Sequence, residues 1–315
     1  MPSITQLQYI LAVAELGHFG KAAEARHVSQ PTLSGQIARA EDELGVQLFI
    51  RGTKPVELTD KGRTLLPEIE AVVASHERLL RLASHDLQTI AGKLTVGVIP
   101  TLAPYVLPWW VGALVERYPE VQLAIVERPT ESLIDGLKNR HVDVALLAGP
   151  LDEDELEERV LFRDPFHLYA HPEHPLARCE APIRPEQLRA DEPWLLEDGH
   201  CLRHQALSIC GRSHSSGPLG VRFEAASLET LSYLIDASGG YTLIPETFAQ
   251  RLPKERRLER VRPLEDPVPC REVALAFPRA SWKRELVSAL EEVVRGHIPK
   301  AILAADPGAE VVAPR

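Results

Sequence analysis

Residues 29–45 read SQPTLSGQIARAEDELG, and this stretch decides the fold of the N-terminal part of the chain. Ser29 is of the type that caps helix N-termini, Pro31 suits a first helical turn, and Gly45 is a typical helix stop. Apolar residues at helical spacing form one stripe: Leu33, Ile37, Ala40 and Leu44. The stretch therefore predicts an amphipathic helix whose first turns carry polar side chains.

Two further helices are predicted before this one, and a strand pair after it. Residues 4–16, ITQLQYILAVAEL, have apolar positions at helical spacing, and residues 21–27, KAAEARH, form a short alanine-rich helix. Two short helices joined by a tight turn make a helix-turn-helix, whose second helix enters the DNA major groove. Residues 47–59, QLFIRGTKPVELT, read as two short strands around a Lys54-Pro55 turn, as a wing requires.

The start of the 29–45 helix offers hydrogen-bonding groups suited to bases and phosphates, and the wing offers two cations. The candidates for DNA contact are Ser29, Gln30, Pro31, Thr32, Ser34, Gln36, Arg51 and Lys54. Charge does not indicate DNA binding, because the formal net charge is −10 and residues 1–63 hold seven basic and seven acidic residues. An ordinary helical hairpin with a polar face remains the alternative at this point.

The segment from residue 59 to residue 90 has the spacing of a coiled-coil seam. Its apolar positions are Leu65, Ile69, Val72, His76, Leu79, Ala83 and Leu87, at intervals of 4, 3, 4, 3, 4 and 4 residues. Such a helix either packs on its own domain or joins two copies of the chain. We expect a linker helix over 59–90 that forms a homodimer.

From residue 91 the pattern changes to alternating strands and helices. We expect strands over 93–99, 121–127 and 142–149, and helices over 101–119 and 130–141. The strands are almost continuously apolar, which is typical of a parallel sheet covered by helices on both faces. Alternating strands and helices continue to about Pro299, and residues 301–315 are expected to be a disordered tail.

Residues 194–212, WLLEDGHCLRHQALSICGR, place Cys201 and Cys210 nine positions apart. The run from Cys201 reads as a short helix, which puts this thiol at a helix start beside His200 and Arg203. Helix N-termini and nearby cations lower the pKa of a thiol and favour the reactive thiolate, although Glu197 and Asp198 act against this. Cys201 is therefore a candidate reactive thiol.

The spacing of the two cysteines limits what they can form. Nine residues of intact helix span about 13 Å, whereas a disulfide needs Cα atoms within about 7 Å. A bond between Cys201 and Cys210 would require the segment to unwind, which is the property of a switch. Small buried cysteines remain possible, and C-x8-C is not a common zinc spacing, so we expect no metal.

Several classes of protein are excluded by what the chain lacks. There is no phosphate-loop motif and no nucleophile elbow, so the sequence indicates neither an enzyme nor a cofactor. No apolar stretch reaches the roughly 18 residues of a membrane span, and the N-terminus lacks a signal peptide. We expect a cytoplasmic protein with no membrane partner, whose thiols are kept reduced.

Residues 7–51, LQYILAVAELGHFGKAAEARHVSQPTLSGQIARAEDELGVQLFIR, and LTDKG at 58–62 closely resemble the N-terminal region of LysR-type transcriptional regulators. The resemblance covers about residues 3–298. It implies a regulator that binds double-stranded DNA, acts with RNA polymerase and assembles as a homodimer and homotetramer. It is not the pattern of an enzyme.

The same resemblance implies the domain organisation. A winged helix-turn-helix occupies 1–58 and a linker helix 59–90. An α/β effector domain over 91–300 is made of two Rossmann-like lobes of the periplasmic-binding-protein type. Lobe I takes 91–163 and 270–300, and lobe II takes 164–269. The chain is expected to cross between the lobes near Arg163–Pro165 and Pro267–Arg271.

EDGHCLR at 197–203, IPTLAPYVLP at 99–108 and SLETL at 227–231 resemble one branch of this family, whose members sense hydrogen peroxide. The resemblance implies that Cys201 reacts with peroxide, that Cys210 resolves the product into a reversible disulfide, and that antioxidant genes are controlled. The residues implied to hold peroxide or activate the thiol are Thr101, Thr130, His200, Arg203 and Arg271. His204 departs from the branch, because an acid is expected there.

Three other functions remain open at this point. The first is a LysR-type metabolic regulator that binds a small co-inducer between its lobes. The second is a solute-binding protein with an added N-terminal module. The third is a cysteine peroxidase, which would need turnover and no DNA.

Overall fold

The computed structural model describes residues 1–50, 52, 55–83, 90–189, 193–211, 227–279, 281, 283–305 and 310–314. The chain divides into two compact units, Met1–Thr89 and Ile90–Arg315. Each unit is considered by itself.

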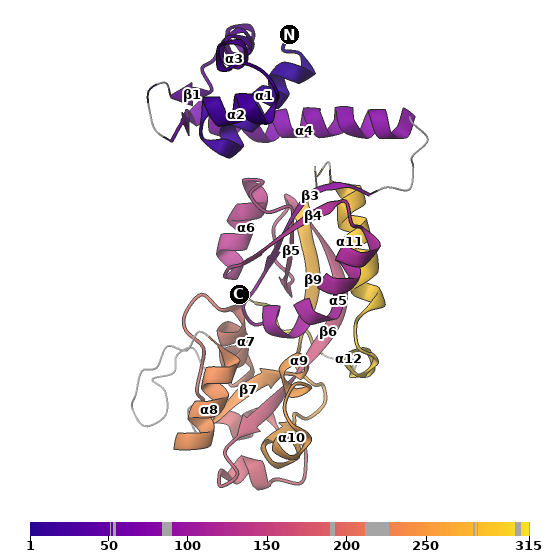
Figure 1. Cartoon of the computed structure of the whole chain (residues 1–315). Helices are drawn as coiled ribbons and strands as arrows, with labels where there is room; N and C mark the ends of the chain where they lie inside the picture. The colour runs from indigo at the N-terminus through magenta and orange to yellow at the C-terminus, as the bar shows by residue number, and fades with distance from the viewer. Residues whose placement is uncertain are drawn as a thin grey trace. The chain divides into compact units, whose positions relative to one another are not determined.

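The N-terminal unit is a winged helix-turn-helix followed by a long helix (Figure 1). Its elements are α1 (Ile4–Leu16), α2 (Phe19–Ala25), α3 (Gln30–Leu44), β1 (Phe49–Ile50), β2 (Glu57–Leu58) and α4 (Asp60–Ala83). The Ser29 hydroxyl accepts the Thr32 N–H at the start of α3, and Gly45, with a φ of +70°, ends this helix. The predicted helix-turn-helix and the antiparallel wing strands are confirmed.

A buried carboxylate fastens the wing to α3. Glu41 lies on α3, and its Oε1 accepts the backbone N–H groups of Leu48 at 2.7 Å and Phe49 at 3.2 Å. A buried charge is tolerated where hydrogen bonds replace its water. The first residue of β1 is therefore positioned by a side chain of α3.

The C-terminal unit is built on strands in the order β4-β3-β5-β9-β6-β7, with β8 paired to β6. Its strands are β3 (Gly92–Val98), β4 (Val121–Glu127), β5 (Val144–Gly149), β6 (Leu156–Ala170), β7 (Tyr241–Pro245), β8 (Val261–Pro263) and β9 (Cys270–Pro278). Its helices are α5 (Ala103–Arg117), α6 (Thr130–Lys138), η1 (Pro175–Arg178), η2 (Pro185–Arg189), α7 (Cys201–Ile209), α8 (Leu228–Ser238), α9 (Glu246–Ala249), α10 (Lys254–Arg260), α11 (Arg284–Gly296) and α12 (Lys300–Ala304).

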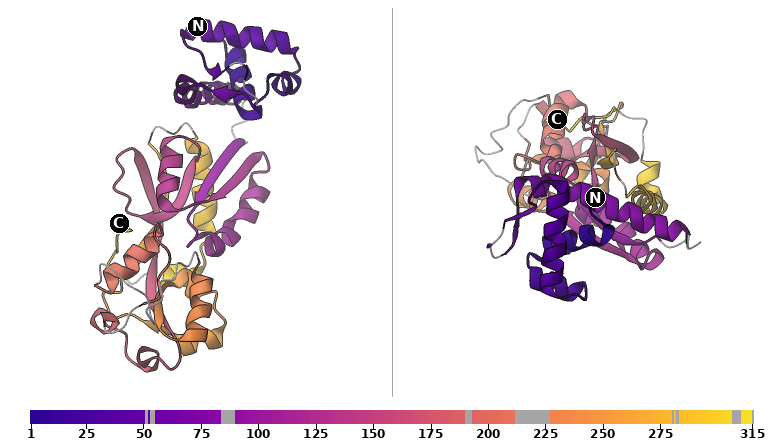
Figure 2. Two further views of the ribbon diagram at one scale, coloured as in Figure 1. Left: turned by 90° about the vertical axis from the view of Figure 1, so that its left-hand side faces the viewer. Right: turned by 90° about the horizontal axis from the view of Figure 1, so that it is seen from above.

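Lobe I is the predicted parallel arrangement, extended by β9, which runs against the other strands, and by β6, which pairs with β9. Strand β3 pairs in parallel with both β4 and β5, whereas β9 lies antiparallel between β5 and β6. Helix α6 covers one face of this sheet, and α5 and α11 cover the other (Figures 1 and 2). The carboxyl ends of β3 and β4 lead into α5 and α6, which is where α/β sheets bind ligands.

The strands β6 and β9 carry the chain between the lobes. Residues 156–165 of β6 pair with β9, and residues 166–170 pair with β7 and β8 instead. The register places Asp164 opposite Arg271 at the crossing. The predicted fold class of two α/β lobes with an N-terminal winged helix is confirmed.

The expectation of a disordered tail is wrong for the tail residues that the structure describes. Residues 300–304 form α12, and residues 310–312 bind β9. The Cys270 N–H donates to the Glu310 carbonyl at 2.9 Å, and the Val312 N–H donates to the Cys270 carbonyl at 2.8 Å. Strand β5 pairs with β9 only as far as Glu272, so the edge of β9 at Cys270 is open to the tail.

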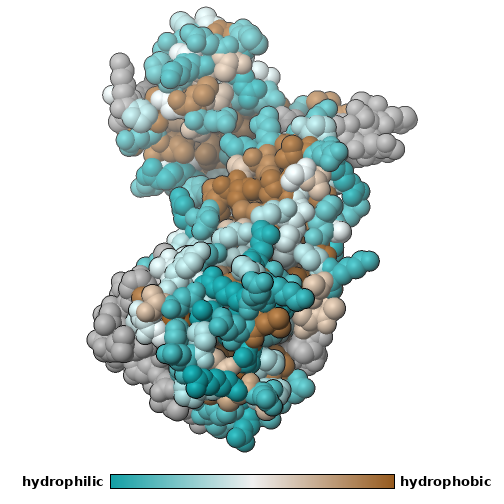
Figure 3. Space-filling model, turned by 60° about the horizontal axis from the view of Figure 1, so that its bottom comes forward, coloured by the Kyte–Doolittle hydropathy of each residue, from teal (hydrophilic) through white to brown (hydrophobic). Residues whose placement is uncertain are grey.

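The distal surface of lobe II is mostly hydrophilic in the view of Figure 3. Helix α10, with the sequence KERRLER, buries none of its residues. Its three arginines are paired, because Arg256 and Arg260 bind Asp236 and Arg257 binds Glu246. Within the described part of the chain, no helix is both long and apolar enough to cross a bilayer.

Gly62 should be irreplaceable in the winged helix. A Cβ at this position of α4 would lie 2.2 Å from the Leu48 carbonyl oxygen, a backbone atom that cannot move aside cheaply. We expect Gly62→Ala to lower the free energy of unfolding by about 2 kcal/mol or more, as overpacking does. Denaturant unfolding measures the change.

Gly35→Ala is the matched control. Gly35 is also helical, and nothing lies within 4 Å of an added Cβ. Alanine should stabilise that position by about 0.5–1 kcal/mol. Similar effects of the two substitutions would contradict the close approach at Gly62.

Candidate redox site and nucleic-acid interface

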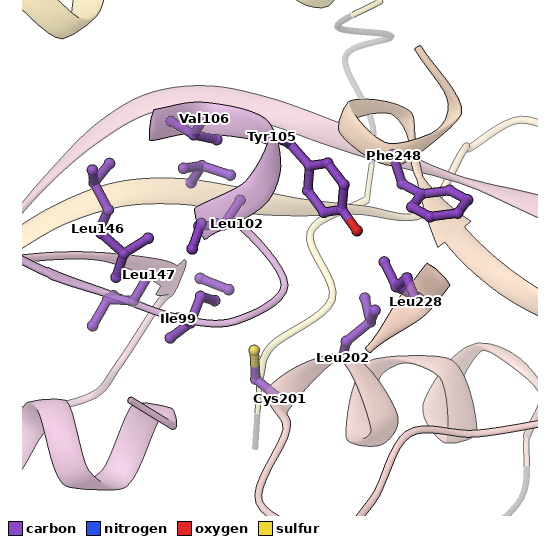
Figure 4. Close-up of a cluster of buried hydrophobic side chains, with 14 of the residues drawn as sticks. Ile99, Leu102, Tyr105, Val106, Leu146, Leu147, Cys201, Leu202, Leu228 and Phe248 are labelled. Atoms are coloured by element: carbon purple, nitrogen blue, oxygen red, sulfur yellow. The ribbon is translucent and has the colours of Figure 1, made fainter. Parts of the chain in front are cut away.

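Cys201 is the first residue of α7 and is only 7% exposed. In Figure 4 the sulfur faces apolar side chains of lobe I, among them Ile99, Leu102 and Leu147, although α7 belongs to lobe II. The thiol therefore lies between the lobes. The predicted position of Cys201 at a helix start is confirmed.

A buried ion pair joins the two crossing strands near this thiol. Arg271 and Asp164 are both fully buried, and Asp164 Oδ2 lies 2.9 Å from Arg271 Nη2 and 3.1 Å from Nε. Arg271 also donates to the hydroxyl and the carbonyl of Thr101 in lobe I, both at 3.1 Å. Asp164 accepts the backbone N–H of Thr247 in lobe II at 2.9 Å and its hydroxyl at 2.8 Å. The pair thus fastens both lobes beside Cys201.

Burial raises the pKa of the Cys201 thiol above its ordinary value. The Arg271 charge, the neighbouring Thr130 hydroxyl and the Leu202 N–H act in the opposite direction, because each favours the ionised sulfur. The sequence left the direction open, because the helix start lowers the pKa and nearby acids raise it, and in the structure desolvation is the largest effect. The resting thiol is therefore protonated, with the groups that stabilise its anion already in place.

Thr130 is the first residue of α6 and is buried. No residue in the described part of the chain meets ordinary hydrogen-bond geometry with its hydroxyl. The hydroxyl is near enough to the Cys201 sulfur to stabilise the ionised form. A buried hydroxyl without a partner costs stability, which is a common feature of a binding position.

The structure gives Arg203 a different task from the one expected. Its Nε lies 2.8 Å from Asp198 Oδ1, and its Nη1 donates to the Leu196 carbonyl at 2.8 Å. The cation that lowers the Cys201 pKa is Arg271. Arg203 therefore braces the loop that precedes α7.

His200 and Cys210 lie at the two ends of α7. His200 is the N-cap residue and is buried, with Nε2 3.4 Å from Glu197 Oε1. Cys210 is the C-cap residue and is fully buried. Because α7 is intact, the helical rise separates the two cysteines by about 13 Å. Both are thiols in this structure.

The sequence analysis missed Tyr105 as part of this region. Its hydroxyl, from lobe I, donates to Glu229 Oε1 of lobe II at 2.7 Å, and its ring packs edge-on against Phe248 at 5.7 Å. Burial and Glu229 raise the pKa of Tyr105, so the hydroxyl keeps its proton. Figure 4 shows Tyr105, Phe248, Leu202 and Leu228 filling the space between the lobes. The only sequence signal for Tyr105 and Glu229 was that they lie in the IPTLAPYVLP and SLETL motifs, which carry the family resemblance.

The first turn of α3 is available for a partner. Ser29, Gln30, Pro31 and Thr32 are exposed, and the Ser29 and Thr32 hydroxyls lie 2.8 Å apart. These side chains occupy the helix start that reads base edges in helix-turn-helix proteins.

The other residues predicted to contact DNA differ in how available their side chains are. Gln36 is engaged within the fold, because its Oε1 accepts from Gln6 Nε2 of α1 at 3.0 Å. Ser34 and Gln30 line a cavity of about 470 Å³ beside the wing. Arg51 and Lys54 lie outside the described residues.

A metal centre finds no support in the described residues. Among them, no group of three or more histidine, cysteine, aspartate or glutamate side chains is placed to hold a metal ion. The two histidines of the HPEHP turn, His171 and His174, accept backbone N–H groups of that turn.

Two family models match this chain along most of its length. Residues 4–63 match the bacterial regulatory helix-turn-helix proteins of the lysR family, and residues 87–299 match the LysR substrate binding domain. The chain therefore belongs to the LysR family of DNA-binding transcriptional regulators, which are not enzymes.

Individual relatives narrow this assignment. The DNA-binding transcriptional dual regulator OxyR of Escherichia coli K12 is 35% identical over 306 residues, covering 95% of this chain and 98% of its own. A full-length OxyR cysteine-to-aspartate variant from Pseudomonas aeruginosa is 32% identical with a TM-score of 0.75, covering 94% of this chain and 98% of its own. A hydrogen-peroxide-bound OxyR cysteine-to-serine mutant from Corynebacterium glutamicum is 30% identical with a TM-score of 0.61, covering 98% and 99%. Within the LysR family the chain falls in the OxyR group.

Gln30→Ala should weaken specific DNA binding more than non-specific binding. Gln30 is exposed at the start of α3, where side chains reach base edges, whereas non-specific affinity comes from phosphate contacts. We expect a loss of about 1–3 kcal/mol on the specific site, the value of one good base contact. Titrations at two salt concentrations on operator and random DNA measure it.

Gln122→Ala, an exposed glutamine of β4, is the control and should change neither affinity. Equal losses on both DNAs for Gln30→Ala would place this residue against the backbone.

Thr130→Val should make Cys201 harder to ionise. The change keeps the volume and removes the hydroxyl that lowers the pKa of the thiol. Near neutral pH, alkylation of Cys201 by iodoacetamide should slow roughly tenfold, because a hydrogen bond to a charged group contributes about 1.5 kcal/mol. Since burial already raises this pKa, the rate should rise with pH in both proteins, with the variant's profile at higher pH.

Peptide-level mass spectrometry follows Cys201 separately from the other thiols. Ser208→Ala removes an exposed hydroxyl from the same helix and should leave the profile unchanged. A Thr130→Val profile that coincides with the original would remove the hydroxyl from the site.

Proposed function

We propose that this protein is a peroxide-sensing transcriptional regulator whose signal is a reversible disulfide between Cys201 and Cys210. The observation that carries the proposal is the surroundings of Cys201: a fully buried arginine and a buried hydroxyl without a partner in the described residues. The relatives named as OxyR and as hydrogen peroxide-inducible genes activators support it.

The chemistry takes two steps, and its atoms balance. The Cys201 thiolate attacks one peroxide oxygen, the O–O bond breaks, and the thiol becomes a sulfenic acid while the second oxygen leaves as water after taking the thiol proton. The Cys210 sulfur then attacks the Cys201 sulfur, and a second water leaves as the S–S bond forms. One peroxide and two thiols give one disulfide and two waters.

Each neighbour of the thiol has a task in the first step. Arg271 and the Leu202 N–H stabilise the sulfur anion. We infer that the Thr101 and Thr130 hydroxyls orient peroxide and stabilise the departing oxygen. His200 is the N-cap residue directly before Cys201 and is assigned to the same step. Arg203 enters only through the loop that it braces.

A small oxidant fits this region better than a metabolic co-inducer. Tyr105, Phe248, Leu202 and Leu228 are buried in the space between the lobes near Cys201. A co-inducer there would have to displace several packed side chains and the Tyr105–Glu229 hydrogen bond. Hydrogen peroxide is little larger than a water molecule.

Unwinding of α7 would carry the signal to the DNA-binding units. We propose a homodimer through α4, supported by Val72 and Leu79 on that helix, which are 48% and 62% exposed despite being apolar. A homotetramer, contact with RNA polymerase and control of antioxidant genes complete the proposal. A cytoplasmic location agrees with a DNA partner and with thiols that must return to the reduced state.

Mapping the cysteines by mass spectrometry before and after a brief pulse of dilute hydrogen peroxide tests the proposal. We expect an intramolecular Cys201–Cys210 disulfide as the first product and its loss after treatment with a dithiol. Cys210→Ser should stop at the sulfenic acid or more oxidised forms, which dimedone labelling detects.

Cys179 and Cys270 are the internal controls. Cys179 Sγ lies 3.6 Å from the Pro175 carbonyl on η1, and Cys270 lies in the β9 ladder. A first bond between these two, or no bond at all, would overturn the proposal.

A further inference from the structure

The end of the chain is bound to both elements that the redox site depends on. Glu310 and Val312 bind the backbone of Cys270, the residue before Arg271 on β9. The Val312 carbonyl also accepts Gln205 Nε2 of α7 at 2.8 Å. Residues 310–314, which we name the C-terminal strap, therefore connect β9 to α7.

Gln205 is the residue of α7 that receives this connection, and it is fully buried. Its amide nitrogen is bonded to the strap, whereas its Oε1 has no hydrogen-bond partner in the described residues. A buried acceptor without a partner opposes the state that contains it. If α7 unwound and exposed Gln205, water could bind that oxygen. The desolvation of Oε1 therefore disfavours the wound helix, and the bond to the strap opposes this effect.

Disulfide formation requires this helix to open. Cys201 and Cys210 stand about 13 Å apart along intact α7, and their Cα atoms must come within about 7 Å. Gln205 lies between the two cysteines, so unwinding displaces the residue that the strap binds.

We infer that the C-terminal strap and Gln205 are positioning elements that set the rate of the second redox step. They stabilise wound α7 and thereby lengthen the lifetime of the Cys201 sulfenic acid before Cys210 reaches it. Their bonds run to the backbone of Cys270 and to each other, and peroxide attack on Cys201 does not require α7 to open. The inference rests on the proposed Cys201–Cys210 disulfide.

A protein truncated after Ala305 tests the inference, because it keeps α12 and lacks the strap. Rapid-quench mass spectrometry separates the two steps, since loss of the Cys201 thiol depends on peroxide concentration and disulfide formation does not. We expect the disulfide-forming rate to rise about tenfold, equivalent to about 1.4 kcal/mol. The rate of the first step should stay within about twofold, and dimedone should trap less sulfenic acid.

Two single substitutions complement the truncation. Val312→Pro removes the N–H that binds the Cys270 carbonyl and should accelerate the second step less than the truncation does. Glu310→Ala changes an exposed side chain and keeps the backbone bonds, so its rates should match those of the full-length protein.

A double-mutant cycle separates this role from general loss of stability. Gln205→Met keeps a side chain of similar length and cannot bind the strap. If the strap acts through Gln205, truncation should accelerate the second step less in the Gln205→Met background than in the original. Equal acceleration in both backgrounds would contradict the connection.

The outcomes distinguish this inference from the proposed function. Absence of a Cys201–Cys210 disulfide in the full-length protein overturns the proposed function itself. If the disulfide forms but truncation leaves its rate unchanged, only the strap is overturned. If truncation instead slows the attack on Cys201, the strap supports the thiol's surroundings and the inference is wrong.

Discussion

The buried pair of Asp164 and Arg271 is the constraint on which the C-terminal unit depends. It stands where β6 and β9 cross between the lobes, and it binds Thr101 in one lobe and Thr247 in the other. A buried ion pair is weak evidence of net stability, because desolvation offsets the attraction. Its structural effect is positional: either charge alone would be buried without compensation, so the two strands and both lobes must keep this arrangement. The same guanidinium supplies the positive charge felt by Cys201.

The site balances two opposing requirements on one thiol. Enclosure between the lobes leaves only 7% of Cys201 exposed, but it raises the pKa of the thiol and keeps the sulfur protonated. Arg271, Thr130 and the N-terminus of α7 reduce that cost without exposing the sulfur. A thiol of this kind is shielded from bulky reagents, while the groups that stabilise its anion are fixed before any oxidant arrives. Selectivity for a small oxidant follows from the enclosure rather than from a strongly acidic thiol.

Local signals in the sequence predicted the helices and strands, but they could not predict contacts between residues that are far apart in the chain. Ser29, Pro31 and Gly45 mark α3 because capping acts over three or four residues. Cys201 was placed at a helix start because apolar residues follow it at helical spacing. Asp164 and Arg271 are 107 positions apart, and Tyr105 and Glu229 are 124 apart, so neither pair leaves a periodic signal.

Thr101 and Thr130 were predicted as site residues only through the family resemblance. Nearness in sequence to Cys201 did not show that Arg203 would pair with Asp198. The tail was misjudged because it pairs with β9 through backbone groups, which no side-chain pattern encodes.

Helix α7 must satisfy two demands that follow from these contacts. It has to remain wound in the reduced protein, because its rise keeps the two cysteines about 13 Å apart and its first turn supports the thiolate. It also has to open once Cys201 is oxidised, so its stability cannot be large. The fully buried Gln205 meets both demands. Its bond to Val312 favours the wound state, and its Oε1, which has no hydrogen-bond partner in the part of the chain that the structure describes, opposes it. A leucine at this position would favour the buried state, because it has no polar atom that loses water on burial. The wound helix would then be too stable for oxidation of Cys201 to open it.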